Sequence, residues 1–146
     1  MKRDMIINRP SHSWTWAASA VLLVSAVLFG ACGTTAVAPD ITLVSVSEAS
    51  QIVADAPTGL VVLDVRTPEE YNQGHLAGAI NVDFYAEDFS AQLDQLDKAV
   101  PYVLYCKSGN RSGQTAPIMA DLGFAEVYEI EGGVDAWAAA GQPLER

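Results

Sequence analysis

GLVVLDV, residues 59–65, is an apolar run interrupted only by Asp64, and it is the strongest indication of the fold in this sequence. A strand covered by helices on both faces is apolar at consecutive positions, whereas a half-exposed strand alternates apolar and polar residues. The next segment, TPEEYNQG (67–74), has the signals of a helix start, with Thr67 as the cap and Pro68 at the first helical position. A buried strand followed directly by a helix predicts part of a parallel sheet.

Alternation of strand and helix continues along the rest of the chain. Further strands are predicted at 41–45, 78–82, 101–106 and 125–130, and further helices at 48–56 (with Ser47 as the cap), 86–97, 112–123 and 133–141. Pro117 is expected to kink or shorten the helix that contains it. The pattern predicts an α/β fold, a parallel sheet with helices on both faces. Functional clefts of such sheets lie beyond the carboxyl ends of the strands.

One of these strand ends carries an unusual set of residues. In YVLYCKSGNRSGQTA (102–116) the apolar strand ends at Cys106, and Lys107, Gly109 and Arg111 follow before the next helix. Loop N–H groups, a helix N-terminus and two cations lower the pKa of a thiol and attract a small anion. A guanidinium can hold an oxyanion with two hydrogen bonds. We therefore expect Cys106 to attack an anionic substrate that Arg111 holds.

The alternative for Cys106 is a small buried apolar residue at the end of a strand, which is the commoner role of a free cysteine. The basic, glycine-containing loop that follows favours the catalytic interpretation. On that interpretation, substrate binding falls to the five residues after the nucleophile: Lys107, Ser108, Gly109, Asn110 and Arg111.

Three separated motifs resemble the rhodanese family of sulfurtransferases, in particular its single-domain members. VVLDVRTPEEYNQGHLAGAINV (61–82) is similar to the family's first signature, and YCKSGNRS (105–112) is similar to its active-site loop. IEGGVDAWAAAGQPLE (130–145) is similar to its closing motif, in which many members have Trp at the position of Val134. The resemblance covers 42–146 and implies a rhodanese-like parallel five-stranded sheet with helices on both faces.

The resemblance also implies a reaction. Cys106 would attack the outer sulfur of thiosulfate or a similar donor, release sulfite, and pass the sulfur of its persulfide to cyanide or to a thiol, including a protein thiol. Such double displacement gives ping-pong kinetics. Arg111 matches the arginine that closes the family's loop, and Lys107 stands where a basic residue is associated with thiosulfate use. No metal and no organic cofactor are implied.

Two rival functions are left open by the sequence. The related phosphatases and arsenate reductases have five residues between the cysteine and the arginine of this loop, which then encloses a bulkier oxyanion. The present chain has four residues between Cys106 and Arg111, which favours sulfur transfer. A module that carries a persulfide for a partner enzyme, without rapid turnover of its own, would have the same loop.

The other polar residues near these motifs have two interpretations each. Asp64, Arg66 and Glu70 could act as acids and bases, but a network of ion pairs and caps that supports the loop is favoured, because a buried charge must be paired. His75 could be a general base, but a turn histidine hydrogen-bonded to the backbone is favoured, because a thiol of low pKa needs no base. Trp137 is expected to lie in the core.

The first part of the chain, residues 1–31, has the pattern of an export signal. Three basic residues precede an uncharged apolar run, 14–31, that ends in small residues. The ending LFGAC resembles a bacterial lipoprotein signal, which implies that Cys32 carries a lipid anchor at the membrane of the cell envelope. Residues 32–41 would then be a tether and 42–146 the rhodanese domain. A permanent transmembrane anchor and plain secretion are the alternatives.

Charge and cysteine content limit the partners. Residues 33–146 contain 17 acidic and 5 basic residues, a net charge of −12. Nucleic acid and anionic lipid surfaces are therefore poor partners. The two cysteines of the chain would in an exported protein suggest a disulfide. If Cys32 carries lipid, however, Cys106 has no partner, which favours a chemical task for its thiol.

Overall fold

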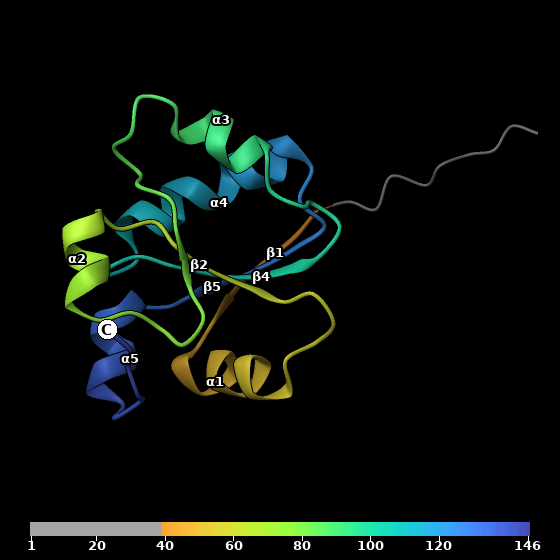
Figure 1. The fold of residues 1–146 in the computed structure, drawn as a ribbon. Coiled ribbons are helices and arrows are strands. Elements are labelled where there is room, and N and C mark those ends of the chain that lie inside the picture. Colours follow the sequence, from red (N-terminus) through yellow and green to blue (C-terminus); the bar gives the residue numbers. More distant parts are fainter. Residues whose placement is uncertain (1–38) are drawn as a thin grey trace, which may run out of the picture. The chain divides into compact units, whose positions relative to one another are not determined.

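The computed structural model describes residues 39–146, so the export signal at 1–31 and the lipid on Cys32 concern residues outside this range. The described chain alternates strands and helices (Figure 1). The strands are β1 (Asp40–Val44), β2 (Val61–Asp64), β3 (Ile80–Asn81), β4 (Pro101–Tyr105) and β5 (Glu126–Ile130). The helices are α1 (Val46–Asp55), α2 (Pro68–Gln73), α3 (Phe89–Asp94), α4 (Asn110–Leu122) and α5 (Gly133–Ala139).

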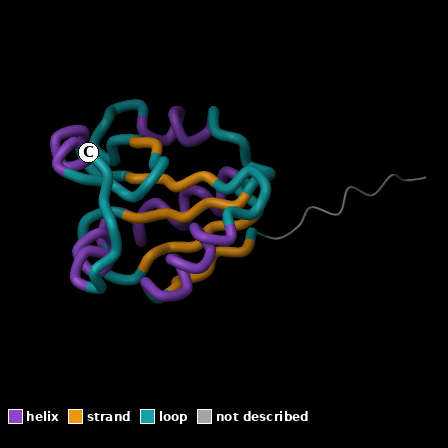
Figure 2. Tube along the Cα trace, turned by 60° about the horizontal axis from the view of Figure 1, so that its bottom comes forward, coloured by secondary structure: helices purple, strands orange, loops and turns teal. Residues whose placement is uncertain are grey.

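The strands form one five-stranded sheet in the order β1-β5-β4-β2-β3 (Figure 2). Every pair of neighbouring strands is parallel. The fold predicted from the sequence, a parallel five-stranded sheet covered by helices, is therefore confirmed. Within residues 39–146, no helix is long and apolar enough to cross a bilayer.

Helices cover both faces of the sheet, as the apolar strands predict. In Figure 1, α3 and α4 lie on one side of the sheet, and α1 and α5 lie on the other. Tyr102 and Leu104 of β4 are buried in the core on the first side, and Val103 and Tyr105 are buried on the second. Because both faces are buried, β4 is apolar at consecutive positions.

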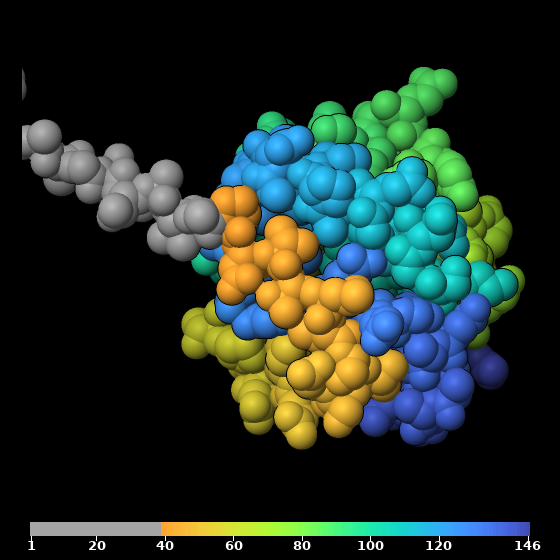
Figure 3. Space-filling model, turned by 180° about the vertical axis from the view of Figure 1, so that it is seen from behind, coloured from red at the N-terminus to blue at the C-terminus, as the bar shows by residue number. Residues whose placement is uncertain are grey.

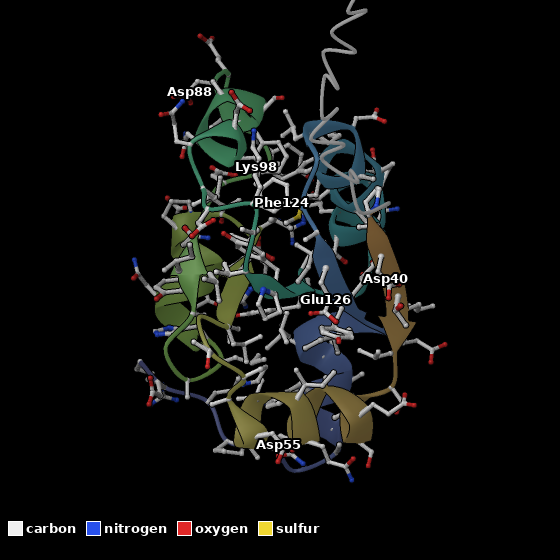
Figure 4. The ribbon with its side chains drawn as sticks, turned by 90° about the vertical axis from the view of Figure 1, so that its right-hand side faces the viewer. Asp40, Asp55, Asp88, Lys98, Phe124 and Glu126 are labelled. Carbon is white, nitrogen blue, oxygen red and sulfur yellow. The ribbon has the colours of Figure 1, made fainter. Side chains whose placement is uncertain are left out.

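The amino and carboxyl ends of the strands lie at opposite edges of the sheet, and the sequence motifs follow the carboxyl ends. Phe124 points into the core between α3 and α4 at the amino ends of the strands (Figure 4) and is fully buried. Near the same end Asp40 and Glu126 face each other on β1 and β5. Edge strand β1 reaches the surface between α1 and α4 (Figure 3). The carboxyl ends lead into the loops that carry the sequence motifs.

Two helix starts lie earlier than the sequence predicts. Ser45, not Ser47, caps α1: its side chain accepts a hydrogen bond from the N–H of Glu48, whose carboxylate accepts one from the N–H of Ser45. Helix α4 begins at Asn110 because Gly109, with φ +95°, turns the chain within one residue. Asn110 and Arg111 are therefore helical residues and not loop residues.

The remaining differences are small. Pro117 lies inside α4 without shortening it, and its position is exposed, so water can bind the carbonyl that its missing N–H leaves free. Strand β1 begins at Asp40, inside the range expected to be a tether. Helix α3 spans only Phe89–Asp94, and α5 ends at Ala139, before Gly141.

Candidate active site

Cys106 lies at the carboxyl end of β4, which pairs with β2 on one side and β5 on the other. A turn of three residues separates it from α4, a helix of 13 residues. The N-terminus of such a helix presents N–H groups without intrahelical partners and a partial positive charge. The fold thus places the predicted nucleophile at the carboxyl edge of the sheet, where the sequence predicted a functional site.

Hydrogen-bond donors surround the sulfur of Cys106, a residue that is 1% exposed. The N–H of Gly109 donates to Sγ at 3.1 Å, and Oγ of Ser112 lies 3.5 Å from Sγ. Burial acts to raise the pKa of the Cys106 thiol. Hydrogen bonds from the Ser112 hydroxyl and from the N–H groups of Ser112, Ser108 and Gly109 outweigh burial and lower that pKa. The site therefore favours a thiolate.

Helix α5 holds the first peptide groups of the loop in place. The N–H of Val134 donates to the carbonyl of Cys106 at 2.9 Å, and the N–H of Asp135 donates to that of Lys107 at 3.0 Å. Gly133, with φ +59°, lets these backbones approach, because a Cβ there would lie 2.7 Å from the Lys107 oxygen and closer still to the Cys106 oxygen. Gly133 of the closing motif therefore allows α5 to hold the loop that follows Cys106.

Arg111 is paired with Glu70 of α2. Its Nη1 and Nη2 donate to the two carboxylate oxygens of Glu70 at 2.6 and 2.8 Å, and the Arg111 residue is 9% exposed. Glu70 also accepts a hydrogen bond from the N–H of Thr67, the cap of α2. The Tyr85 ring lies 5.7 Å from the Arg111 guanidinium carbon. The guanidinium group of Arg111, which was expected to bind substrate, is thus bound to Glu70. Anion binding by Arg111 stays a prediction.

The Glu70–Arg111 pair gives a prediction on stability against pH. Hydrogen bonds from Arg111 lower the pKa of Glu70 to about 2, against burial, which raises it. A lowered carboxyl pKa contributes stability above the unfolded value, and this contribution is lost as the pH falls toward the folded value. We expect Glu70→Gln to lower the free energy of unfolding by about 1 kcal/mol at neutral pH, since the pair is partly exposed. Urea unfolding at a series of pH values measures the difference, which should shrink in acid.

The matched control for this experiment is Glu69→Gln. Glu69 is also in the first turn of α2, but it is exposed. Its replacement should change stability little at any pH. Equal losses for the two variants, or a Glu70→Gln deficit that persists in acid, would contradict the stabilising role of the pair.

The supporting residues Asp64 and Arg66 form a second, separate ion pair. Asp64 is fully buried, and its carboxylate accepts from Nη2 of Arg66 at 2.6 Å. Arg66 also donates to the carbonyl of Gly74 at 2.8 Å, which ties the end of β2 to the end of α2. These two residues thus form an ion pair, as the favoured interpretation predicts, and their support of the loop stays a prediction. The sequence grouped Glu70 with them, whereas its ion-pair partner is Arg111.

Two further interpretations from the sequence are confirmed. Nδ1 of His75 lies 3.1 Å from the carbonyl of Tyr71, and its backbone pairs with that of Glu145, as expected of a turn histidine. Trp137 is 4% exposed and belongs to the core on the α1 and α5 side of the sheet.

The other predicted substrate-binding residues lie at the surface. Lys107, Ser108 and Asn110 are exposed. Lys107 lines a hollow of about 300 Å³ between α2 and α5, together with Arg66 and Glu70, whereas Cys106 does not line it. The loop therefore has a buried side, which holds the sulfur, and an exposed cationic side.

The sequence did not single out Ser112, which contacts the sulfur of Cys106, or Glu129, which contacts Ser112. Ser112 is fully buried in the first turn of α4. Its Oγ lies 2.7 Å from Oε1 of Glu129, which stands on β5 opposite Leu104. The one signal in the sequence is the acidic residue within the otherwise apolar strand segment VYEI (127–130).

Known proteins resemble this chain in sequence and in fold. A family model described as "Rhodanese-like domain" matches residues 45–140. The chain is 38% identical to thiosulfate sulfurtransferase 16, chloroplastic, of Arabidopsis thaliana, over 57% of this chain and 78% of the relative. It is also 38% identical to a thiosulfate sulfurtransferase of Ectopseudomonas mendocina, over 56% and 72%. A crystal structure of a rhodanese-related protein from Thermoplasma volcanium matches with a TM-score of 0.63 at 25% identity, covering 71% of this chain and 97% of that one.

Proposed function

Because the chain belongs to the rhodanese-like domain family, we propose that it moves sulfane sulfur from thiosulfate, or a similar anionic donor, to a thiophilic acceptor through a persulfide on Cys106. The observation that carries the proposal is the environment of Sγ. The sulfur of Cys106 accepts hydrogen bonds at the N-terminus of α4, and these bonds lower the pKa of the thiol. A thiolate in such a position is a ready nucleophile.

The reaction consists of two displacements at sulfur. In the first, the Cys106 thiolate attacks the outer sulfur of thiosulfate, a new S–S bond forms, and sulfite leaves with the electron pair of the old bond. In the second, cyanide or a thiolate attacks the outer sulfur of the persulfide, and the Cys106 thiolate leaves. Negative charge therefore stays within reach of the same N–H groups throughout both steps. Donors fixed before the reaction cost no reorganisation during it.

Binding of the anionic donor is assigned to Arg111, in the first turn of α4, and to Lys107, in the turn before it. Arg111 has five N–H groups and gives two of them to Glu70, so the others are available to an oxyanion. Lys107 is exposed beside the loop and adds a charge that attracts anions to it. Residues 33–146 have only five basic residues and a net charge of −12, and two of those five are Lys107 and Arg111.

A persulfide carrier is the second candidate, and the same loop favours it. It differs from the enzyme in rate, since a carrier loads sulfur but releases it only to its own partner. Phosphatase and arsenate reductase activities fit less well, because the loop from Cys106 to Arg111 holds four intervening residues and encloses a smaller volume.

The experiment that tests the proposal is an intact mass measurement. The full chain carrying Cys32→Ser, purified in detergent, has Cys106 as its only thiol, since the chain has two cysteines. Incubation with thiosulfate should add one sulfur atom, and cyanide should remove it. Failure to form this adduct would overturn the sulfurtransferase proposal. Loading without repeated turnover to cyanide would favour the carrier.

The proposed location is the cell envelope, with the domain held at the membrane by lipid on Cys32. We expect Cys32→Ala to abolish the lipid-anchored mature form, because the replacement removes the thiol that takes the lipid. The variant protein should then be found unprocessed or released from the membrane. Membrane fractionation with mass analysis of the N-terminal peptide measures this, and Cys106→Ala is the control that should fractionate normally. An unchanged, membrane-bound mature form of Cys32→Ala would refute lipidation at this cysteine.

A further inference from the structure

We propose that Glu129 is a positioning residue that controls the protonation of Cys106 through the hydroxyl group of Ser112. The inference rests on the proposed function, because it concerns the nucleophile of that reaction. Glu129 comes from β5 and Ser112 from α4, so the fold brings them to the sulfur from two different elements.

The hydroxyl group of Ser112 has more acceptors around it than it has protons. Oγ lies 2.7 Å from Oε1 of Glu129, 3.2 Å from the carbonyl oxygen of Gly109 and 3.5 Å from Sγ of Cys106. A serine hydroxyl donates one hydrogen bond and accepts two. Ser112 is fully buried, so water does not supply a further donor at this point. The Glu129 carboxylate, the Gly109 carbonyl and the Cys106 sulfur therefore compete for one proton.

The charge of Glu129 decides this competition. An ionised carboxylate takes the hydroxyl proton, because a charge-assisted hydrogen bond at 2.7 Å is stronger than a long bond to sulfur. Oγ then turns a lone pair toward Sγ, which favours the protonated thiol as donor. A neutral carboxyl group instead donates its own proton to Oγ. The hydroxyl is then free to donate to Sγ, which favours the thiolate.

Proton transfer along this chain of groups is balanced. The proton that leaves Sγ of Cys106 is taken up by Oγ of Ser112, and the proton of Oγ passes to Oε1 of Glu129. Negative charge moves from the carboxylate to the sulfur, and the site as a whole neither gains nor loses a proton. The thiolate that results can attack thiosulfate while its carboxyl neighbour is neutral, which lessens repulsion of the dianion.

The surroundings of Glu129 support such sharing. Its partners in the sheet are Leu43 of β1 and Leu104 of β4, which carry no charge. Ser112 and Gly113 of α4 face the carboxylate of Glu129. Arg111, the cation that precedes Ser112 in the sequence, is bound to Glu70. Burial raises the pKa of Glu129, and the bond from Ser112 offsets part of that effect. The pKa of the Cys106 thiol is shifted in the opposite direction, downward, by the hydrogen bonds to its sulfur.

The test uses Glu129→Gln, whose amide keeps the shape of the carboxyl but is always neutral and can donate to Oγ. In the full chain with Cys32→Ser, the rate of alkylation of Cys106 by iodoacetamide is measured as a function of pH. We expect the midpoint to move to lower pH. At a pH below the wild-type midpoint, alkylation should be about threefold faster if the midpoint falls by one pH unit, because a less basic thiolate is also less nucleophilic.

Two controls isolate the path through the hydroxyl. Glu131→Gln makes the same chemical change two residues away at an exposed position and should leave the midpoint unchanged. In a Ser112→Ala background, Glu129→Gln should no longer move the midpoint. A midpoint that is unmoved or raised in Glu129→Gln, or moved equally with and without Ser112, would overturn the proposal.

The proposal can still be tested if Glu129→Gln does not fold or if the chain does not transfer sulfur. If Glu129→Gln fails to fold, Glu129→Leu, which matches the apolar neighbours in the sheet, removes the competing acceptor and must also lower the midpoint. Alkylation needs no sulfur donor, so the test does not depend on sulfur transfer. A chain that never forms a persulfide would overturn the proposed function and leave this measurement intact.

Discussion

Cys106→Ser is expected to lower kcat/KM for sulfur transfer from thiosulfate to cyanide by about 10⁴-fold or more, as the loss of a nucleophile does in other covalent enzymes. A serine hydroxyl stays protonated at neutral pH, and the donors that stabilise a thiolate at this site do not lower its pKa far enough. The side chain is buried and the replacement nearly isosteric, so the fold should be kept. Steady-state kinetics with equal amounts of folded protein measure the loss.

Cys32→Ser is the matched control for this prediction, because it removes the other cysteine of the chain by the same chemical change. Its kcat/KM should equal that of the unmodified protein. Residual activity of Cys106→Ser within tenfold of the parent would mean that another group is the nucleophile. Thermal unfolding of both variants shows whether a loss of activity reflects a loss of fold.

The second large effect is expected for Gly133→Ala. Alanine at φ +59° costs about 1–2 kcal/mol by itself, and its Cβ would collide with the carbonyl oxygens of Lys107 and Cys106. Both sides of this contact are backbone, one after β4 and one at the start of α5, so neither can turn away. We expect the free energy of unfolding to fall by about 3 kcal/mol. Displacement of the loop should also lower kcat/KM by about 100-fold.

Gly141→Ala separates the cost of the positive φ from the cost of the collision between the added Cβ and the loop. Gly141 also has a positive φ, +74°, but an added Cβ would meet no atom within 4 Å. This variant should lose only the conformational part of the stability and keep its kcat/KM. Denaturant unfolding and steady-state kinetics of the two variants side by side are the measurement. Equal losses of activity would show that the close approach of Gly133 to the loop is not what positions Cys106.

The fold could be predicted because its signals are local. Apolar residues at consecutive positions of 59–65 and 101–106 indicate strands that are buried on both faces, and the structure has them as β2 and β4. The capping residues of α2 could also be predicted, since Thr67 and Glu70 lie three positions apart. The start of α1 was predicted two residues too late, although Ser45 and Glu48 have the same three-residue spacing and Ser47 has Ser50 at that distance.

The site could be predicted only as far as its residues are neighbours in the sequence. Cys106 to Arg111 form one continuous segment, so their grouping needed no tertiary information. Arg111 and its partner Glu70 are 41 positions apart, and Ser112 and Glu129 are 17 apart. Those contacts depend on the strand order of the sheet and on the packing of α2 and α4, which no local pattern specifies.

The burial of Cys106 has a consequence for which molecules can react at each step. Cys106 is 1% exposed, so in the proposed reaction its bare sulfur would admit only a narrow donor whose terminal atom can enter the turn. The reactive atom of the proposed persulfide would be the outer sulfur, about 2 Å from Sγ along the new S–S bond. It can be reached there by an acceptor too large to touch Cys106 itself. The burial of Cys106 would thus limit the size of the sulfur donor more strictly than the size of the sulfur acceptor.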